Sequence, residues 1–198
     1  MNMKTIIRQG KFLFILPLFV SLNLQAQVVL EAKPDKSLML IKGTSNLHDW
    51  EENVGKFKCE MVVTEKGHEV QSIDKVKFSC KATDIKSDHS LMDDKTQDAL
   101  KSGKFPAIDF KMVSLDSIES KNGHFNGILS GNLNLAGVTK KVSIPFTGSV
   151  LASNNIEVNV EKKIVLKNFN ITPPTAMFGT LKTGSDVTLQ FKLLMVPD

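Results

Sequence analysis

Residue types that mark several functional classes are scarce in this chain. It contains no tyrosine, one tryptophan and two cysteines in 198 residues. Two cysteines are too few for a disulfide-stapled scaffold. The chain also lacks a glycine-rich phosphate loop and a dinucleotide fingerprint, so the common nucleotide-binding folds are not indicated. What the sequence does contain is a long series of alternating apolar and polar residues.

The first 26 residues have the layout of a secretory signal. Lys4, Arg8 and Lys11 precede the apolar run Phe12–Leu24, which is shorter than the roughly 20 residues that a membrane-spanning helix needs. The end of this run, Leu24-Gln25-Ala26, resembles a signal-peptidase site and predicts cleavage after Ala26. We therefore expect an exported protein, periplasmic or extracellular, with no transmembrane span in its mature form.

Removal of the signal changes the charge of the chain. Its three basic residues account for most of the formal net charge of +4, so the mature chain is close to +1. The remaining basic residues are scattered, and no nucleic-acid partner is expected. Residues 27–198 suit a single domain with a sizeable core.

Apolar and polar residues alternate through Phe105–Val196 with short turn-forming clusters between them. A period of two gives each strand one dry and one wet face. We expect strands near residues 28–32, 37–43, 55–65, 73–83, 107–118, 124–135, 141–151, 156–167 and 187–195, and a loop over 170–184. One helix is expected between Asp84 and Lys104, where Ser90 and Asp93 have the spacing of a capping box. Its thin apolar side suits a surface position or one across an opening. The pattern predicts an all-β fold, an antiparallel barrel of about eight strands, with an open sandwich as the alternative.

Cys59 and Cys80 fall on the apolar faces of two strands that are expected to form a hairpin. A turn centred near residue 69 would place the two cysteines opposite each other, because opposed residues keep a constant sum. A cross-strand disulfide is then feasible in an exported protein. Two buried thiols that act as small apolar side chains are the alternative.

Catalytic and metal-binding signals are weak. Ser45, His48 and Asp49 lie within five residues and lack a nucleophile elbow, so a polar turn explains them better than hydrolysis. Asp88, His89, Asp93 and Asp94 fit no standard ligand spacing and are better explained as the acidic start of a helix. We expect no catalytic residues, no metal and no cofactor.

The expected interior could hold a ligand. Glycines alternate with large apolar residues on the face that starts at Phe125, and inward glycines subtract side-chain volume. The same glycines would also relieve crowding in a filled barrel, so both interpretations stay open. An interior rich in Phe and Met suits a long hydrocarbon better than a polar metabolite. The candidate ligand-binding residues are Phe57, Met61, Phe78, Phe110, Met112, Phe125, Gly127, Leu129, Gly131, Phe146 and Phe191.

Several segments together resemble a known family. They are Gly43–Trp50 (Gly-Thr-Ser-Asn-Leu-His-Asp-Trp), Leu91–Asp93 with Ala99–Lys101, Phe105–Phe110, Gly131–Lys140 and Met177–Gly184. In this order they resemble the YceI-like lipid/polyisoprenoid-binding family, and are most similar to its exported members. The resemblance implies a lipocalin-like, extended antiparallel barrel with a helix in a long crossover and an apolar tunnel. It also implies an apolar lipid partner such as a polyisoprenoid. The helix departs from the family pattern at residues 94–97, which are polar and should make the entrance more polar.

The leading hypothesis is a non-enzymatic exported protein that holds an isoprenoid-type lipid in its barrel. A packed structural or stress-related exported domain without ligand is the alternative, and an enzyme acting on small lipids is the weakest. Trp50 is expected to plug one barrel end and His48 to hydrogen-bond within its turn; both contacting a lipid headgroup is the alternative. Transient contact with a membrane and a homodimer are also compatible with this interpretation.

Overall fold

A computed structural model describes residues 26–198. The predicted signal segment lies outside this range except for Ala26. The strands are β1 (Ala26–Ala32), β2 (Leu38–Ser45), β3 (Trp50–Val54), β4 (Phe57–Lys66), β5 (Glu69–Lys81), β6 (Ile85–Lys86), β7 (Ala107–Lys121), β8 (His124–Leu135), β9 (Val138–Val150), β10 (Ile156–Val165), β11 (Thr175–Ala176) and β12 (Leu181–Pro197), with one α-helix, α1 (Ser90–Ala99).

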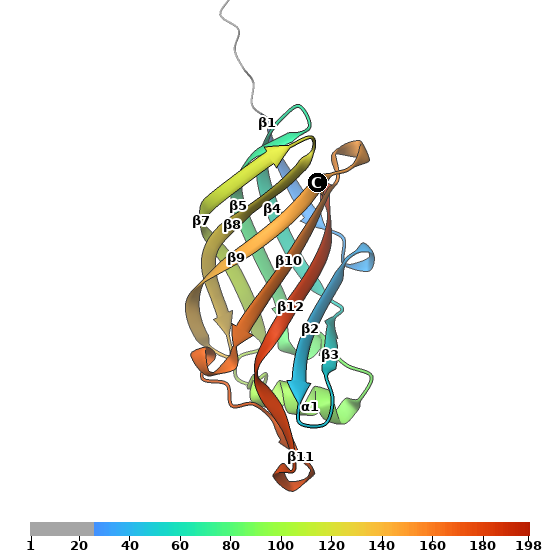
Figure 1. Ribbon diagram of the computed structural model, residues 1–198, viewed down its shortest axis with the longest axis vertical. Helices are drawn as coiled ribbons and strands as arrows, with labels where there is room; N and C mark the ends of the chain where they lie inside the picture. Colours follow the sequence, from blue (N-terminus) through green and yellow to red (C-terminus); the bar gives the residue numbers. More distant parts are fainter. Residues whose placement is uncertain (1–25) are drawn as a thin grey trace, which may run out of the picture.

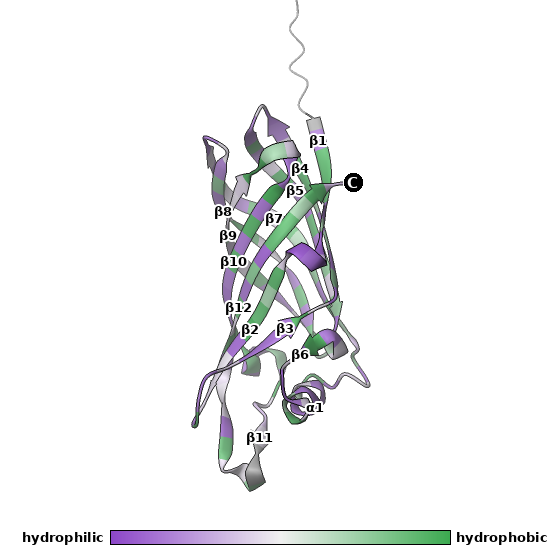
Figure 2. Cartoon of the chain, turned by 90° about the vertical axis from the view of Figure 1, so that its right-hand side faces the viewer, coloured by the Kyte–Doolittle hydropathy of each residue, from purple (hydrophilic) through white to green (hydrophobic). Residues whose placement is uncertain are grey.

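Eight strands close into an antiparallel barrel in the order β1-β4-β5-β7-β8-β9-β10-β12, and β12 returns to β1 (Figure 1). This confirms the predicted all-β barrel with a single helix. Strand β12 pairs with β10 along one edge; along its other edge it pairs first with β2 and then with β1. The strands carry apolar and polar bands along their length, as the alternating sequence predicts (Figure 2).

A short ribbon extends the sheet at the end away from the C-terminus. There β2 pairs with β3, and β3 pairs with β6. Helix α1 follows β6 and lies across this end of the barrel, beside β2 and β3 (Figures 1 and 2). The predicted position of the helix over an opening therefore agrees with the structure. We call this end of the barrel the helix end.

The start of α1 is stabilised differently from the predicted capping box. The N-cap is His89, and it makes no capping hydrogen bond through its side chain. The Asp93 carboxylate instead accepts bonds from the backbone N–H and the hydroxyl of Ser87, at 2.7 and 2.9 Å. It also pairs with Lys86 at 3.1 Å. These contacts lower the pKa of Asp93, the backbone bond from Ser87 most of all.

The β4–β5 hairpin turns at Gly67 and His68, not near residue 69, and two bulges follow. The register then places Cys59 opposite Phe78 and Cys80 opposite Phe57. The expected face-to-face cysteine pair is therefore wrong, because the hairpin turns earlier than expected and the two bulges make up only part of the difference. Both cysteines are free thiols in this structure.

The segment expected as a loop over 170–184 is partly ordered as a hairpin. Strand β11 pairs with the first residues of β12, Thr175 with Lys182 and Ala176 with Leu181. The short strands β3 and β6 were also not expected, because neither is long enough to show a clear alternation of apolar and polar residues. All three elements lie at the helix end, where they build its rim.

Side chains fill the opposite end of the barrel, near β1 and the C-terminus. Leu30, Val63, Val70 and Ile156 are fully buried there, and Phe125 is 3% exposed. None of these five residues lines the cavity described below. The interior is thus packed at one end and hollow towards α1.

Candidate functional site: the barrel cavity

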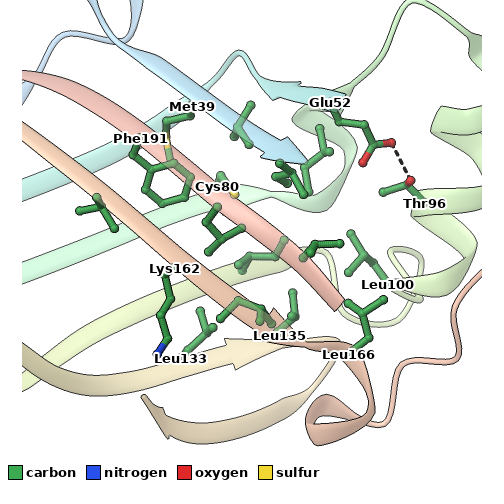
Figure 3. Close-up of a pocket in the computed structure, with 18 of the residues that line it drawn as sticks. Met39, Glu52, Cys80, Thr96, Leu100, Leu133, Leu135, Lys162, Leu166 and Phe191 are labelled. Carbon is green, nitrogen blue, oxygen red and sulfur yellow. Dashed lines mark hydrogen bonds between the residues drawn. The ribbon is translucent and has the colours of Figure 1, made fainter. Parts of the chain in front are cut away.

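The hollow part of the barrel is a cavity of about 430 Å³. This volume falls within the roughly 300–1,000 Å³ of ordinary small-molecule sites. Its wall is almost entirely apolar and comes from most strands of the barrel and from α1; Met39, Leu133, Leu135, Leu166 and Phe191 are examples (Figure 3). A wall of this kind offers dispersion contacts and no directional bonds to an apolar guest.

Six of the predicted ligand-binding residues line this cavity: Met61, Phe78, Phe110, Leu129, Phe146 and Phe191. The other five, Phe57, Met112, Phe125, Gly127 and Gly131, do not line it. Phe57 and Phe125 are buried instead in the hydrophobic core, 8% and 3% exposed. The alternation of the strands identified the inward face, but it could not show at which height the barrel becomes hollow.

The inward glycines do not leave room for a ligand, so of the two interpretations left open by the sequence the structure favours relief of crowding. A β-carbon at Gly131 would collide with the ring of Phe110, and one at Gly127 with Phe146 and the Ser117 carbonyl. Gly148 likewise lies under Phe125. The volume that each glycine gives up is taken by an aromatic ring, so the glycines set the positions of the rings.

The Trp50 indole packs over Gly43 on the paired strand, where a β-carbon would overlap the ring. Its Nε1 donates to the Thr44 carbonyl at 3.0 Å, and the ring lines the cavity at the helix end. His48 makes a 2.7 Å bond to the Asp49 carbonyl through Nδ1. These contacts agree with the expected roles of a plug at the barrel end and a bond within the turn.

The Ser45 hydroxyl belongs to the same turn. It donates to the His48 carbonyl at 2.7 Å and accepts from the backbone N–H groups of Leu47 and His48. No hydrogen bond joins this hydroxyl to the His48 ring, so the three polar residues of the turn do not form a hydroxyl–imidazole–carboxylate relay. Within residues 26–198, no group of three acidic, histidine or cysteine side chains is placed to hold a metal ion.

A buried carboxyl group lies at the helix end of the cavity. Glu52 of β3 is 2% exposed and accepts a 2.6 Å hydrogen bond from the Thr96 hydroxyl of α1 (Figure 3). Burial raises the pKa of Glu52 from 4.5 to about 7, although the bond from Thr96 opposes this shift. Glu52 therefore joins the helix to the barrel wall and changes its charge near neutral pH.

Burial also controls the reactivity of the two cysteines. Cys80 lines the cavity together with Cys59. Loss of hydration raises the pKa of each thiol to about 12. Because the thiolate is the reactive form, we expect both thiols to react slowly at neutral pH in the folded protein.

Sequence reasoning missed two ionisable residues of the cavity, Glu52 and Lys162. Lys162 could have been found, since it occupies an inward position of the alternation Ile156, Val158, Val160, Ile164. Glu52 gave no comparable signal because β3 is short and follows a polar turn.

This cavity defines a class of protein: a closed β-barrel with an apolar interior and a helix across one end. Comparison of the sequence with known families identifies a match. Residues 32–195 match the YceI-like domain, so the chain belongs to the YceI-like family. No curated protein matches the chain in sequence.

Solved structures share the fold at low identity. BcnA from Burkholderia cenocepacia aligns with a TM-score of 0.66 and 14% identity, covering 82% of this chain and 98% of that one. A polyisoprenoid binding domain from Saccharophagus degradans aligns with a TM-score of 0.64 and 9% identity, covering 86% and 99%. The YCEI protein of Campylobacter jejuni aligns with a TM-score of 0.57 and 17% identity, covering 74% and 84%.

Proposed function

We propose that this protein is an exported, non-enzymatic carrier that holds an apolar, isoprenoid-type lipid in the barrel cavity. The observation that carries the proposal is the cavity of about 430 Å³ with an almost wholly apolar wall, in a chain of the YceI-like family. The structural likeness to the polyisoprenoid binding domain of Saccharophagus degradans supports the same ligand class. Export is supported by the signal-like pattern of residues 1–26.

Burial of hydrocarbon supplies the binding energy in this proposal. Each methylene transferred from water to the cavity contributes about 0.8 kcal/mol. Ten such groups contribute roughly 8 kcal/mol before the cost of association is subtracted. An apolar chain therefore needs no directional contact to the wall, in keeping with the scarcity of polar groups there.

The helix end is the proposed route for the lipid and the surface that meets a membrane. Three large apolar side chains are exposed on elements at this end: Leu47 in the β2–β3 turn, Leu91 on α1 and Phe178 in the β11–β12 turn. Their exposed fractions are 70%, 62% and 111%. Apolar side chains of this kind enter the headgroup region of a bilayer, so the lipid could pass between cavity and membrane without crossing water. No helix of the described chain has the length and hydropathy to span a membrane.

Lipid binding is tested with purified, delipidated protein and the neutral prenyl alcohol geranylgeraniol. Trp50, the only tryptophan, lines the cavity, so its fluorescence should change as the ligand enters. We expect Val160→Phe, which narrows the cavity, to weaken binding about tenfold or more. The matched control is Val165→Phe on the same strand, where the side chain is 41% exposed and lies outside the cavity.

Two results would contradict the carrier. One is that organic extraction and mass spectrometry find no lipid in the purified protein, and that the protein also takes up no added geranylgeraniol. This result would favour the packed structural domain. The other is equal binding by both valine variants. Export is tested separately, by finding mature protein that begins at Gln27 outside the cytoplasm. The homodimer stays a prediction.

A further inference from the structure

We propose that the lipid carries a terminal carboxylate and that Lys162 binds this group inside the barrel. The inference rests on the proposed carrier function and narrows its ligand class. A neutral isoprenoid would satisfy the apolar wall alone. A carboxylate is inferred from one cation in the barrel wall, Lys162.

The strand register turns Lys162 inward. On β10 the inward positions are otherwise apolar, and Ile156, Val158 and Ile164 are buried there. Lys162 is half-buried in the same row and lines the cavity (Figure 3). Its two sequence neighbours face outward and are paired: Glu161 accepts a bond from Gln190, and Lys163 forms an ion pair with Asp186 at 2.7 Å.

Lys162 has no partner among the residues that the structure describes. None of their hydrogen bonds or ion pairs involves its ammonium group. The residue opposite it on β12 is Leu189. A positive charge held against an apolar wall loses hydration, and an anion beside it would recover that energy.

Glu52 is the one acidic residue that lines the cavity, and it does not neutralise Lys162. The two residues share a register row, Lys162–Leu189–Ile41–Glu52. Three inter-strand steps separate them, roughly 14 Å along the wall. Glu52 is already bonded to Thr96, and with its pKa of about 7 it is partly uncharged at neutral pH. The cavity thus has an unmatched positive charge.

The composition of the cavity favours one negative charge over several. Phosphate and diphosphate groups are bound by arginine forks, by several lysines or by helix N-termini. The only arginine of the chain is Arg8, outside the described residues. The other lysine of the lining, Lys95, lies on α1 at the helix end. A single lysine, Lys162, therefore suits a ligand group with one negative charge, such as a carboxylate.

The wall beside Lys162 offers a competing explanation. The β9–β10 ladder ends at Phe146 and Val160, next to Pro145, which has no N–H to donate. Lys162 lies in the stretch of β10, from Glu161 onward, that β9 does not pair, so its ammonium could extend outward to water along its apolar stem. In that arrangement the cavity would have no preference for anions.

A matched set of C20 prenyl ligands separates these explanations: geranylgeranoic acid, geranylgeraniol and geranylgeranyl phosphate. Each is titrated into delipidated wild type, Lys162→Met and Lys163→Met, and Trp50 fluorescence or calorimetry gives the affinity. The Lys163 variant removes the same charge from the outer face of the same strand.

We expect wild type and Lys163→Met to bind the acid about tenfold or more tightly than the alcohol. Lys162→Met should lose this preference while its affinity for the alcohol is kept. Equal binding of acid and alcohol by wild type would overturn the inference and leave the carrier function intact. A loss of binding to both ligands in Lys162→Met would also overturn the inference without affecting the carrier function. Tighter binding of the phosphate than of the acid would overturn the proposal that the charged group of the ligand is a carboxylate. Binding of none of the three would refute the carrier itself.

Discussion

The buried carboxyl group of Glu52 makes a quantitative prediction about stability and pH. Its pKa is about 7 in the folded protein and near 4.5 in an unfolded chain. Between these pH values the folded protein holds a proton that the unfolded chain has released. The free energy of unfolding must therefore fall as pH rises through this window, and the loss is complete once pH exceeds the folded pKa. One pKa unit corresponds to about 1.4 kcal/mol, so the total loss is on the order of 3 kcal/mol.

The substitution Glu52→Gln removes this titration. The amide oxygen keeps an acceptor for the Thr96 hydroxyl, and the side chain has no charge to bury at any pH. We expect the variant to gain stability relative to wild type as pH rises, with the difference growing by about 3 kcal/mol between about pH 4.5 and pH 8. Urea unfolding followed by circular dichroism, repeated across this range, measures the difference directly.

Glu51→Gln is the matched control for this experiment. Glu51 is the neighbouring residue on β3, and its side chain is 60% exposed, paired with Lys42 at 3.8 Å. Exposed pairs of this kind contribute about 1 kcal/mol or less. A difference between wild type and Glu52→Gln that stays constant from pH 5 to pH 8 would refute the reasoning, because it would mean that Glu52 is not buried as a titrating group.

Three other features can be tested in the same protein. Gly131→Ala should destabilise the fold by about 1–3 kcal/mol, because the added β-carbon collides with the ring of Phe110. The control Gly55→Ala, whose β-carbon meets nothing within 4 Å, should be nearly neutral, and equal effects of the two substitutions would contradict this packing. Cys59 and Cys80 should react with iodoacetamide slowly when folded and quickly in urea, and mass spectrometry before any reduction should find two alkylated thiols; their absence would mean that a disulfide forms. Phe178→Ser should reduce lipid transfer to vesicles without changing the affinity for geranylgeraniol, and an unchanged transfer rate would exclude this side chain from membrane contact.

The period-two pattern predicted the strands and their two faces, because side-chain direction along a strand is a local property. It favoured a barrel over an open sandwich, and the family resemblance implied the same barrel. It also identified inward residues such as Met61 and Phe191 that line the cavity. It did not predict the register of Cys59 and Cys80, since the polar residues around the turn do not show which of them form it, and the hairpin turns at Gly67 and His68, earlier than expected.

The sequence left the role of the inward glycines open for a different reason. Whether the space beside Gly127 is empty depends on a ring from the neighbouring strand, Phe146, and so on tertiary packing. Glu52 was missed on similar grounds. Its burial requires α1 to lie over β3, and residues 90–99 alone do not show where the helix lies.

The pairing of β12 with both β2 and β1 has a consequence for how the protein assembles. Until Met195–Pro197 meet Leu30–Ala32, the ring of strands is an open sheet with two unsatisfied edges. These partners lie almost at opposite ends of the described sequence, so closure is a contact of very high sequence separation, the kind that slows folding. A chain that stalls before this step would expose strand edges that recruit other chains. Aggregation during refolding should therefore depend strongly on protein concentration, even though the finished barrel presents no such edge between β1 and β12.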